Sequence, residues 1–290
     1  MSEHLTLLCV HAHPDDESSS TGGILRTYAD EGIRTVLVTC TDGSLGDAPD
    51  GTTPELEHHE PDEVAAHRLV ELRNAASILG VARLEILGFK DSGMVGWPQN
   101  DVPGSFWSTP VEEAAARLVP ILLEERPQVI VTYDEKGGYG HPDHIQTHRI
   151  TVAALQMSGL TASLYFTAIP KSAFAEFRSV IEEVQREAEA EAGTAAGQDS
   201  SDDGAADEEG PDNDFGTPDE LIGAVIDVSG AVDAKFDALA AHGSQTERSF
   251  FMKIGRERFR AMFRREAFVR AVDPFDLTGV ADDLFAPWRT

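Results

Sequence analysis

Short apolar runs alternate with stretches of helical periodicity over the first 168 residues of the chain. The runs have the length and the β-branched content of buried strands, and they lie at residues 5–10, 34–40, 84–87, 129–133 and 164–168. Because strands and helices alternate, we expect an α/β fold with a Rossmann-like, mostly parallel sheet flanked by helices. Sheets of this kind bind ligands at the carboxyl ends of their strands.

Helical stripes fill the intervals between these runs. One stripe repeats at spacings of four and three residues and consists of Ala65, Leu69, Leu72, Ala76 and Leu79. Gly80 stands where the C-terminal cap of that helix belongs. A second stripe begins at Val111, with a possible capping box of Thr109 and Glu112 around Pro110 at the first helical position. Pro142 fits the first turn of a third helix, which is predicted to run through Met157.

The pattern changes after residue 168. Residues 172–191 read as an increasingly charged helix, and residues 193–218 are so rich in Gly, Ala, Ser, Asp and Glu that we predict a disordered acidic insertion. Order is expected again at residues 221–228, in a helix through Ala240, and in a last strand at 266–272. We therefore assign residues 1–168 to an α/β core and 169–290 to a smaller C-terminal part that completes the domain.

Charge and composition exclude several kinds of partner. The formal net charge of the 290 residues is −28, and about half of this excess lies in residues 182–220. A binder of nucleic acid or of an anionic membrane needs a basic face, so neither partner is expected.

No apolar run approaches the ~20 residues of a membrane span, and the N-terminus lacks a signal-peptide pattern, so we expect a cytoplasmic protein. Its two cysteines, Cys9 and Cys40, lie in predicted strands as buried thiols. The oligomeric state is left open.

Two groups of ionisable residues follow predicted strands. The first is His-Ala-His-Pro-Asp-Asp-Glu at residues 11–17, and the second ends in Gly-Gly-Tyr-Gly-His-Pro-Asp-His at 137–144. Helix capping by Asp15 or Asp16 would explain one carboxylate and neither histidine of the first group. A glycine-rich loop with surface histidines is the plain alternative for the second. Because the carboxyl ends of parallel strands face the same edge, we expect the two groups to converge on one site.

Imidazole and carboxylate without thiolate suit Zn²⁺ in an open catalytic site, and Fe²⁺ accepts the same ligands. Such a metal lowers the pKa of a bound water to about 7. A spare carboxylate can then accept the proton, and a spare histidine can stabilise the oxyanion or protonate the leaving nitrogen. Spacing alone does not decide which of Asp15 and Asp16 binds the metal. The chain contains no Gly-x-Ser-x-Gly motif, which argues against a serine hydrolase of that kind.

The paired motifs, His-Pro-Asp-Asp-Glu at 13–17 and His-Pro-Asp-His at 141–144, resemble those of the LmbE-like, or PIG-L, zinc deacetylases. The resemblance extends from about residue 5 to residue 155 and is strongest to the actinobacterial mycothiol-pathway members. It implies that His13, Asp16 and His144 bind zinc and that Asp15 is the general base.

The same resemblance implies roles for five further residues. His141 would support the oxyanion and the leaving group, with Asp143 orienting it, and Tyr139 would reach the substrate carbonyl. Arg68 and Asp91 would hold sugar hydroxyls. The implied substrate is a small N-acyl aminosugar. The chain departs from the family pattern in three places: the acidic insertion, residues 18–20 and the loop 94–109. Residues 18–20 lack the lysine associated with the mycothiol S-conjugate amidases of this family. In the loop 94–109, we expect Trp97 or Trp107 to shape the aglycone side of the pocket.

Together these observations predict a metal-dependent hydrolase that removes an N-acetyl group from a glucosamine-type sugar conjugate. Two alternatives stay open. One is cleavage of a mycothiol S-conjugate amide by the same chemistry, and the other is a non-catalytic binding module on the same fold. We further expect His11 to be a buried neighbour of the site and His242 to be a candidate for the pocket wall.

Overall fold

The computed structural model describes residues 5–174, 178, 180, 186 and 216–289. One mixed sheet of seven strands runs through these residues in the order β3-β2-β1-β4-β5-β7-β6. The strands are β1 (Thr6–His11), β2 (Arg34–Thr41), β3 (Arg83–Phe89), β4 (Val129–Thr132), β5 (Ser163–Ala168), β6 (Ile222–Asp227) and β7 (Arg265–Val272). β1 to β5 pair with one another in parallel, whereas β7 pairs antiparallel with both β5 and β6. The predicted fold class, Rossmann-like and mostly parallel, is confirmed.

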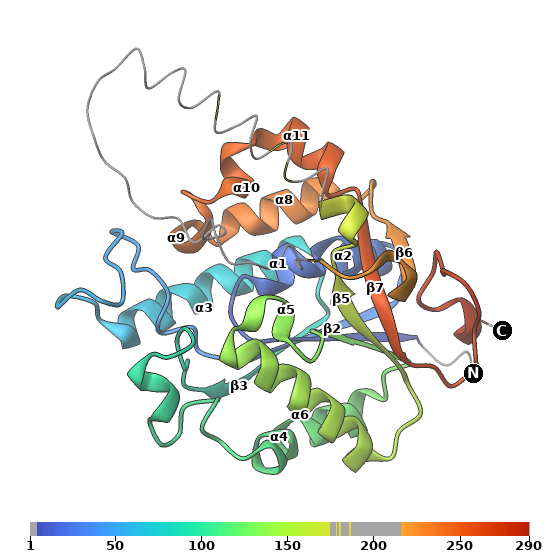
Figure 1. Ribbon diagram of the computed structural model, residues 1–290, viewed down its shortest axis with the longest axis horizontal. Helices are drawn as coiled ribbons and strands as arrows, with labels where there is room; N and C mark the ends of the chain where they lie inside the picture. Colours follow the sequence, from blue (N-terminus) through green and yellow to red (C-terminus); the bar gives the residue numbers. More distant parts are fainter. Residues whose placement is uncertain (1–4, 175–177, 179, 181–185, 187–215, 290) are drawn as a thin grey trace.

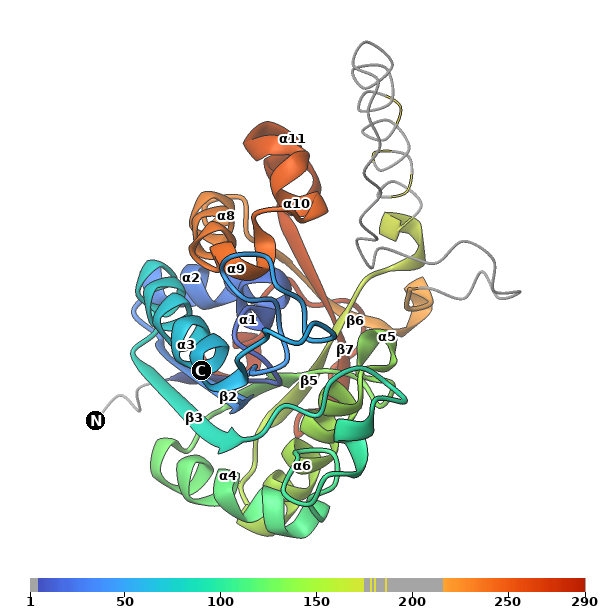
Figure 2. The same cartoon turned by 90° about the vertical axis from the view of Figure 1, so that its left-hand side faces the viewer.

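Helices cover both faces of the sheet (Figures 1 and 2). The longer ones are α2 (Gly22–Asp30), α3 (Pro61–Ile78), α4 (Val111–Glu125), α6 (Pro142–Ser158), α8 (Val232–Ala241) and α11 (Gly255–Met262). Shorter turns are α1 (Asp16–Ser20), α5 (Gly137–Gly140), α9 (Gly243–Thr246) and α10 (Phe250–Lys253), with 3₁₀ turns at Pro98–Asp101, Asp219–Leu221 and Ala286–Trp288. α2, α3 and α8 lie over one face, and α4 and α6 lie over the other.

The apolar runs predicted as strands are continuous because both faces of the central strands are buried. On β1, Leu7 and Cys9 join the core under α2, α3 and α8, whereas Leu8 and Val10 join the core under α4 and α6. The five predicted strands and the α3 and α6 helices match the sequence pattern to within a few residues. Within the described residues no helix is long and apolar enough to cross a membrane.

One capping prediction was wrong. α4 begins at Val111 with Pro110 at the N-cap rather than at the first helical position, and no side chain caps it. The hydroxyl of Thr109 instead donates to the carbonyl oxygen of Ser105 at 2.8 Å. The Thr109 hydroxyl therefore stabilises the preceding loop instead of capping the helix, as the sequence pattern had predicted.

The C-terminal part adds strands to the same sheet. Its residues Phe268, Leu284 and Phe285 pack in the same core cluster as Leu7 and Ile24 of the N-terminal part. Most of the predicted helix at 172–191 and nearly all of the predicted acidic insertion at 193–218 lie outside the described residues.

Candidate active site

The two predicted groups of ionisable residues meet where the direction of strand succession reverses. From β1 the chain continues to β2 and β3 on one side, whereas β4 and β5 lie on the other side of β1. His13 follows β1 and His141 follows β4, so both turns lie at the carboxyl ends of adjacent parallel strands. This is the crevice where open α/β sheets bind ligands.

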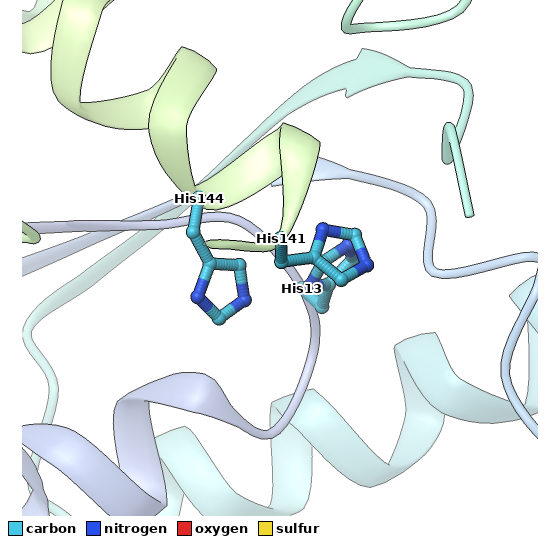
Figure 3. A group of neighbouring side chains, drawn as sticks. All are labelled: His13, His141 and His144. Atoms are coloured by element: carbon cyan, nitrogen blue, oxygen red, sulfur yellow. The ribbon is translucent and has the colours of Figure 1, made fainter. Parts of the chain in front are cut away.

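Three buried histidines face one another in this crevice (Figure 3). Ring nitrogens of His13, His141 and His144 lie within 4.8 Å of one another. His141 is the N-cap of α6 and His144 lies in its first turn, whereas His13 comes from the turn after β1. The convergence of the two turns, expected from the strand ends alone, is thus present in the structure.

The ring of His144 is oriented by two neighbours. Its Nδ1 lies 3.2 Å from the carbonyl oxygen of Gly137, so this nitrogen donates. Tyr133 stacks on the ring with centroids 4.3 Å apart. The other nitrogen, Nε2, is buried and has no hydrogen-bond partner in the part of the chain that the structure describes. Gly137 has φ +65°, and a Cβ there would lie 2.7 Å from the Cβ of His144, so this close approach requires glycine.

Asp16 lies between the histidines of the two turns. Its carboxylate oxygens are 3.4 Å from His13 Nδ1 and 3.4 Å from His144 Nε2. Burial alone would raise the pKa of Asp16, but His144 and His13 hold it well below its ordinary value. An ionised carboxylate therefore faces the unpartnered nitrogen of His144.

Two further carboxylates surround His13. Asp143 Oδ2 is 3.3 Å and Asp91 Oδ1 is 3.7 Å from His13 Nε2. The family resemblance had implied that Asp143 orients His141, but the carboxylate lies against His13. Its contact with the His141 ring comes from the backbone instead, because the Asp143 amide donates to His141 Nδ1 at 3.1 Å. The first turn of α6 brings that amide under the ring of the N-cap residue.

Asp15 has an unusual backbone conformation, φ 130° and ψ −28°, at the N-cap of α1. For a residue other than glycine such a conformation costs on the order of 1–3 kcal/mol. The Asp15 side chain makes no capping hydrogen bond, so plain helix capping does not explain it. Burial raises its pKa to about 6, although Arg68 acts in the opposite direction.

The Arg68 side chain is buried more deeply than we expect for a residue that binds the hydroxyls of a sugar. Its guanidinium is buried and donates to the carbonyl oxygens of Gly43 and Pro14, each at 2.7 Å, and to Asp15 Oδ2 at 3.1 Å. These bonds tie α3 to the turn that carries the catalytic candidates. Its Nε atom is buried and has no hydrogen-bond partner among the described residues. The predicted sugar-binding role of Arg68 stays a prediction.

The remaining candidates lie at the N-cap of α6, in the short turn α5 and in the loop that follows β3. Burial lowers the pKa of His141 to about 2, so its ring is neutral. Tyr139 is 55 % exposed, and its ring lies edge-on to His144 with centroids 5.0 Å apart. In the loop 94–109, the ring of Trp97 covers Gly93, and Arg149 lies 4.8 Å above the ring of Trp107.

Sequence reasoning missed two residues that support the site. Tyr133 stacks on His144 and its hydroxyl accepts the Ala12 amide at 3.0 Å, so it joins β4 to the first turn. Glu17 is fully buried and pairs with His242. The position of Glu17 directly after the two aspartates was a signal, but its partner lies 225 residues away.

A Rossmann-like sheet with buried histidines and carboxylates at its switch point defines an α/β protein with a candidate metal-dependent hydrolase site. The chain belongs to the PIG-L family, described as GlcNAc-PI de-N-acetylase, whose family model matches residues 8–155. Its predicted membership is confirmed.

Two relatives are similar over most of the chain. A "1D-myo-inositol 2-acetamido-2-deoxy-alpha-D-glucopyranoside deacetylase" of Acidothermus cellulolyticus is 44% identical over 83% of this chain and 79% of its own length. One of Catenulispora acidiphila, named deacetylase 1, is 40% identical over 97% of this chain and 88% of its own. The solved N,N'-diacetylchitobiose deacetylase of Pyrococcus horikoshii has the same fold, with a TM-score of 0.55 at 18% identity, over 93% of this chain and 87% of that one.

Proposed function

We propose that this protein is a metal-dependent deacetylase that hydrolyses the N-acetyl amide of a glucosamine-type sugar, with 1D-myo-inositol 2-acetamido-2-deoxy-α-D-glucopyranoside as its substrate. One observation carries the proposal. This chain is 44% identical to a relative with that activity in its name, and its fold brings the histidines of two distant turns together at the edge of the sheet where ligands bind.

The residues present fit a divalent metal. The donor set is imidazole and carboxylate, and His144 Nε2 is a buried nitrogen that faces Asp16 Oδ1 at 3.4 Å but has no hydrogen-bond partner among the described residues. The carboxylates of Asp16, Asp91 and Asp143 surround His13 and favour a cation there. We assign His13, Asp16 and His144 as the ligands of Zn²⁺, and Fe²⁺ is the alternative because it accepts the same donor set.

When bound, the metal supplies Lewis acidity, which makes water a nucleophile at neutral pH. Asp15 is the group assigned to take the proton, because it is the second carboxylate of the same turn, and burial raises its pKa, which favours its protonated form. Asp15 and Asp16 are adjacent, but only Asp16 contacts the two histidines at both of its oxygens. This difference supports assigning the base to Asp15 and the ligand to Asp16.

His141 and Tyr139 are assigned to the acyl group. His141 belongs to the histidine cluster and its ring is neutral, so one N–H can stabilise negative charge on the carbonyl oxygen. The ring of Tyr139 lies beside the rings of His141 and His144. Its side chain is exposed, as a residue that contacts the substrate must be. Asp143 is assigned a positioning role through His13, whose Nε2 lies 3.3 Å from the Asp143 carboxylate.

Substrate selectivity is assigned to Asp91, Arg68 and the loop 94–109. Asp91 lies two residues beyond β3, at the same edge of the sheet as the histidines. A site that hydrogen-bonds sugar hydroxyls rejects analogues that lack them. Trp97 covers Gly93 next to Asp91, which supports the assignment of this loop to the aglycone side. A cytoplasmic location stays a prediction.

The experiment is acetate release from this substrate by the zinc-loaded protein, compared with Asp15→Asn. The variant is isosteric, so it should keep its metal while kcat falls by roughly 10²–10⁴-fold, the usual contribution of one general base. Both arms include an elemental analysis of bound zinc.

Each outcome separates the alternatives. Absence of acetate release by metal-loaded wild-type protein would contradict the deacetylase and favour a binding module. Faster cleavage of a mycothiol S-conjugate amide than of the acetylated sugar would favour the amidase. Full activity in Asp15→Asn would remove Asp15 from the role of base.

A further inference from the structure

A buried pair joins the C-terminal part to the turn that carries Asp15. His242 lies between α8 and α9, and its Nε2 donates to Glu17 Oε1 at 2.7 Å. The side chains of both residues are 0% exposed. Glu17 is in α1, directly after the two aspartates, so this contact reaches the centre of the site from the far end of the chain.

The other oxygen of Glu17 fixes the backbone of Asp15. Glu17 Oε2 accepts the Asp15 amide at 3.0 Å, while Ser18 donates to Oε1 at 2.5 Å. Asp15 has φ 130°, a conformation that a residue with a Cβ rarely adopts. A conformation of that kind persists only where the surroundings hold it in place.

His242 is itself held rigidly. Its backbone amide donates to Leu239 at 3.1 Å, and its carbonyl oxygen contacts the Thr246 hydroxyl at 3.0 Å. The Thr246 hydroxyl also donates to Leu239 at 2.6 Å. These hydrogen bonds fix the turn from which the imidazole reaches Glu17.

We propose that His242 is a positioning residue, which acts through Glu17 to hold Asp15 in the backbone conformation that aims its carboxylate at the reacting water. The inference rests on the proposed function. The Asp15 carboxylate is held separately by Arg68, so backbone and side chain of this residue are fixed by different parts of the chain.

The test compares two substitutions of similar size. His242→Gln keeps an N–H donor that can reach Glu17, whereas His242→Met fills the space without a donor. With zinc content verified, His242→Met should lower kcat by on the order of 100-fold with KM unchanged, as expected for a misplaced catalytic group. His242→Gln should recover most of that loss. Equal kcat in His242→Met and wild type would overturn the proposal.

Two controls separate positioning from stability. Lys235→Met removes a buried charge of α8 that pairs with Glu266, and it should lower stability but leave kcat unchanged. In an Asp15→Asn background, His242→Met should cause no further loss of kcat, because effects that act through one residue are not additive. An additive loss would contradict the proposal.

A structural measurement tests the inference apart from the proposed function. In a crystal structure of His242→Met, Asp15 should leave the positive-φ region, and an unchanged Asp15 backbone would overturn the proposal whatever the activity. If His242→Met does not fold, His242→Asn replaces it, because its shorter side chain leaves a gap at Glu17. If the wild type releases no acetate, the proposed function fails while this structural result still decides the inference.

Discussion

The side chain of His144 is oriented by Gly137 and Tyr133, two residues to which we assign no part in the reaction. The Gly137 carbonyl takes the Nδ1 proton and Tyr133 fixes the plane of the ring. Such neighbours set the tautomer and the direction of a metal-binding histidine. The unpartnered Nε2 then points toward Asp16. The residue type makes a ligand possible, and its neighbours decide which nitrogen is available.

We predict that His144→Ala abolishes stoichiometric zinc binding, because one of three ligands is lost. His148→Ala is the matched control. His148 lies one turn further along α6, and its Nδ1 contacts the carbonyl oxygen of Tyr133 at 3.0 Å, outside the histidine cluster. Elemental analysis after dialysis should find about one zinc per chain in the control and almost none in His144→Ala. Equal zinc in the two variants would contradict the ligand assignment.

At the scale of secondary-structure elements, the strands and the two site turns were predictable from the sequence, because each depends on neighbours along the chain. Buried parallel strands give continuous apolar runs, and ionisable residues after β1 and β4 must share one edge. The side-chain partners were not predictable. The preference of Asp143 for His13 and the pairing of Glu17 with His242 depend on how elements pack.

Glu266 of β7 is a second long-range contact of this kind. Its two oxygens accept the amides of Gly23 and Ile24 at 2.8 and 2.9 Å, so it caps the start of α2 from across the sheet. Lys235 of α8 donates to the same carboxylate at 2.6 Å. Three elements thus meet at one buried charge, and the negative carboxylate suits the positive end of the helix dipole.

We predict that Glu266→Leu lowers the free energy of unfolding by about 3–5 kcal/mol, the usual cost of leaving a buried charge unpaired. The substitution leaves Lys235 and two amides without an acceptor. Lys235→Met should cost less, because Glu266 keeps both amide donors of α2. Urea denaturation of both variants at neutral pH measures the difference. A larger loss in Lys235→Met than in Glu266→Leu would contradict this account.

At the scale of the whole molecule, the sheet and its core do not divide at residue 168. β5 would become an edge strand without β7. The core cluster that contains Leu7 and Ile24 also contains Phe268, Leu284 and Phe285. The contacts of Glu266 with α2 and of His242 with α1 cross the same division. The family motifs lie in residues 8–155, but the residues that support them extend almost to the end of the chain.

We therefore predict that residues 1–168 alone do not fold, whereas the full chain unfolds in one cooperative transition. The fragment would expose Leu7 and Ile24, which share a core cluster with Phe268 and Phe285. It would also lose the acceptor of the α2 amides. Burial of a large aromatic side chain contributes roughly 1.5–3 kcal/mol, so the loss of Phe268 and Phe285 removes about 3–6 kcal/mol. That is a large part of a typical domain stability of about 5–15 kcal/mol, and the β5–β7 pairing is lost as well. Calorimetry and near-ultraviolet circular dichroism of both proteins measure this. A fragment with a cooperative transition and native aromatic signals would show that the division at residue 168 separates two independently folding units.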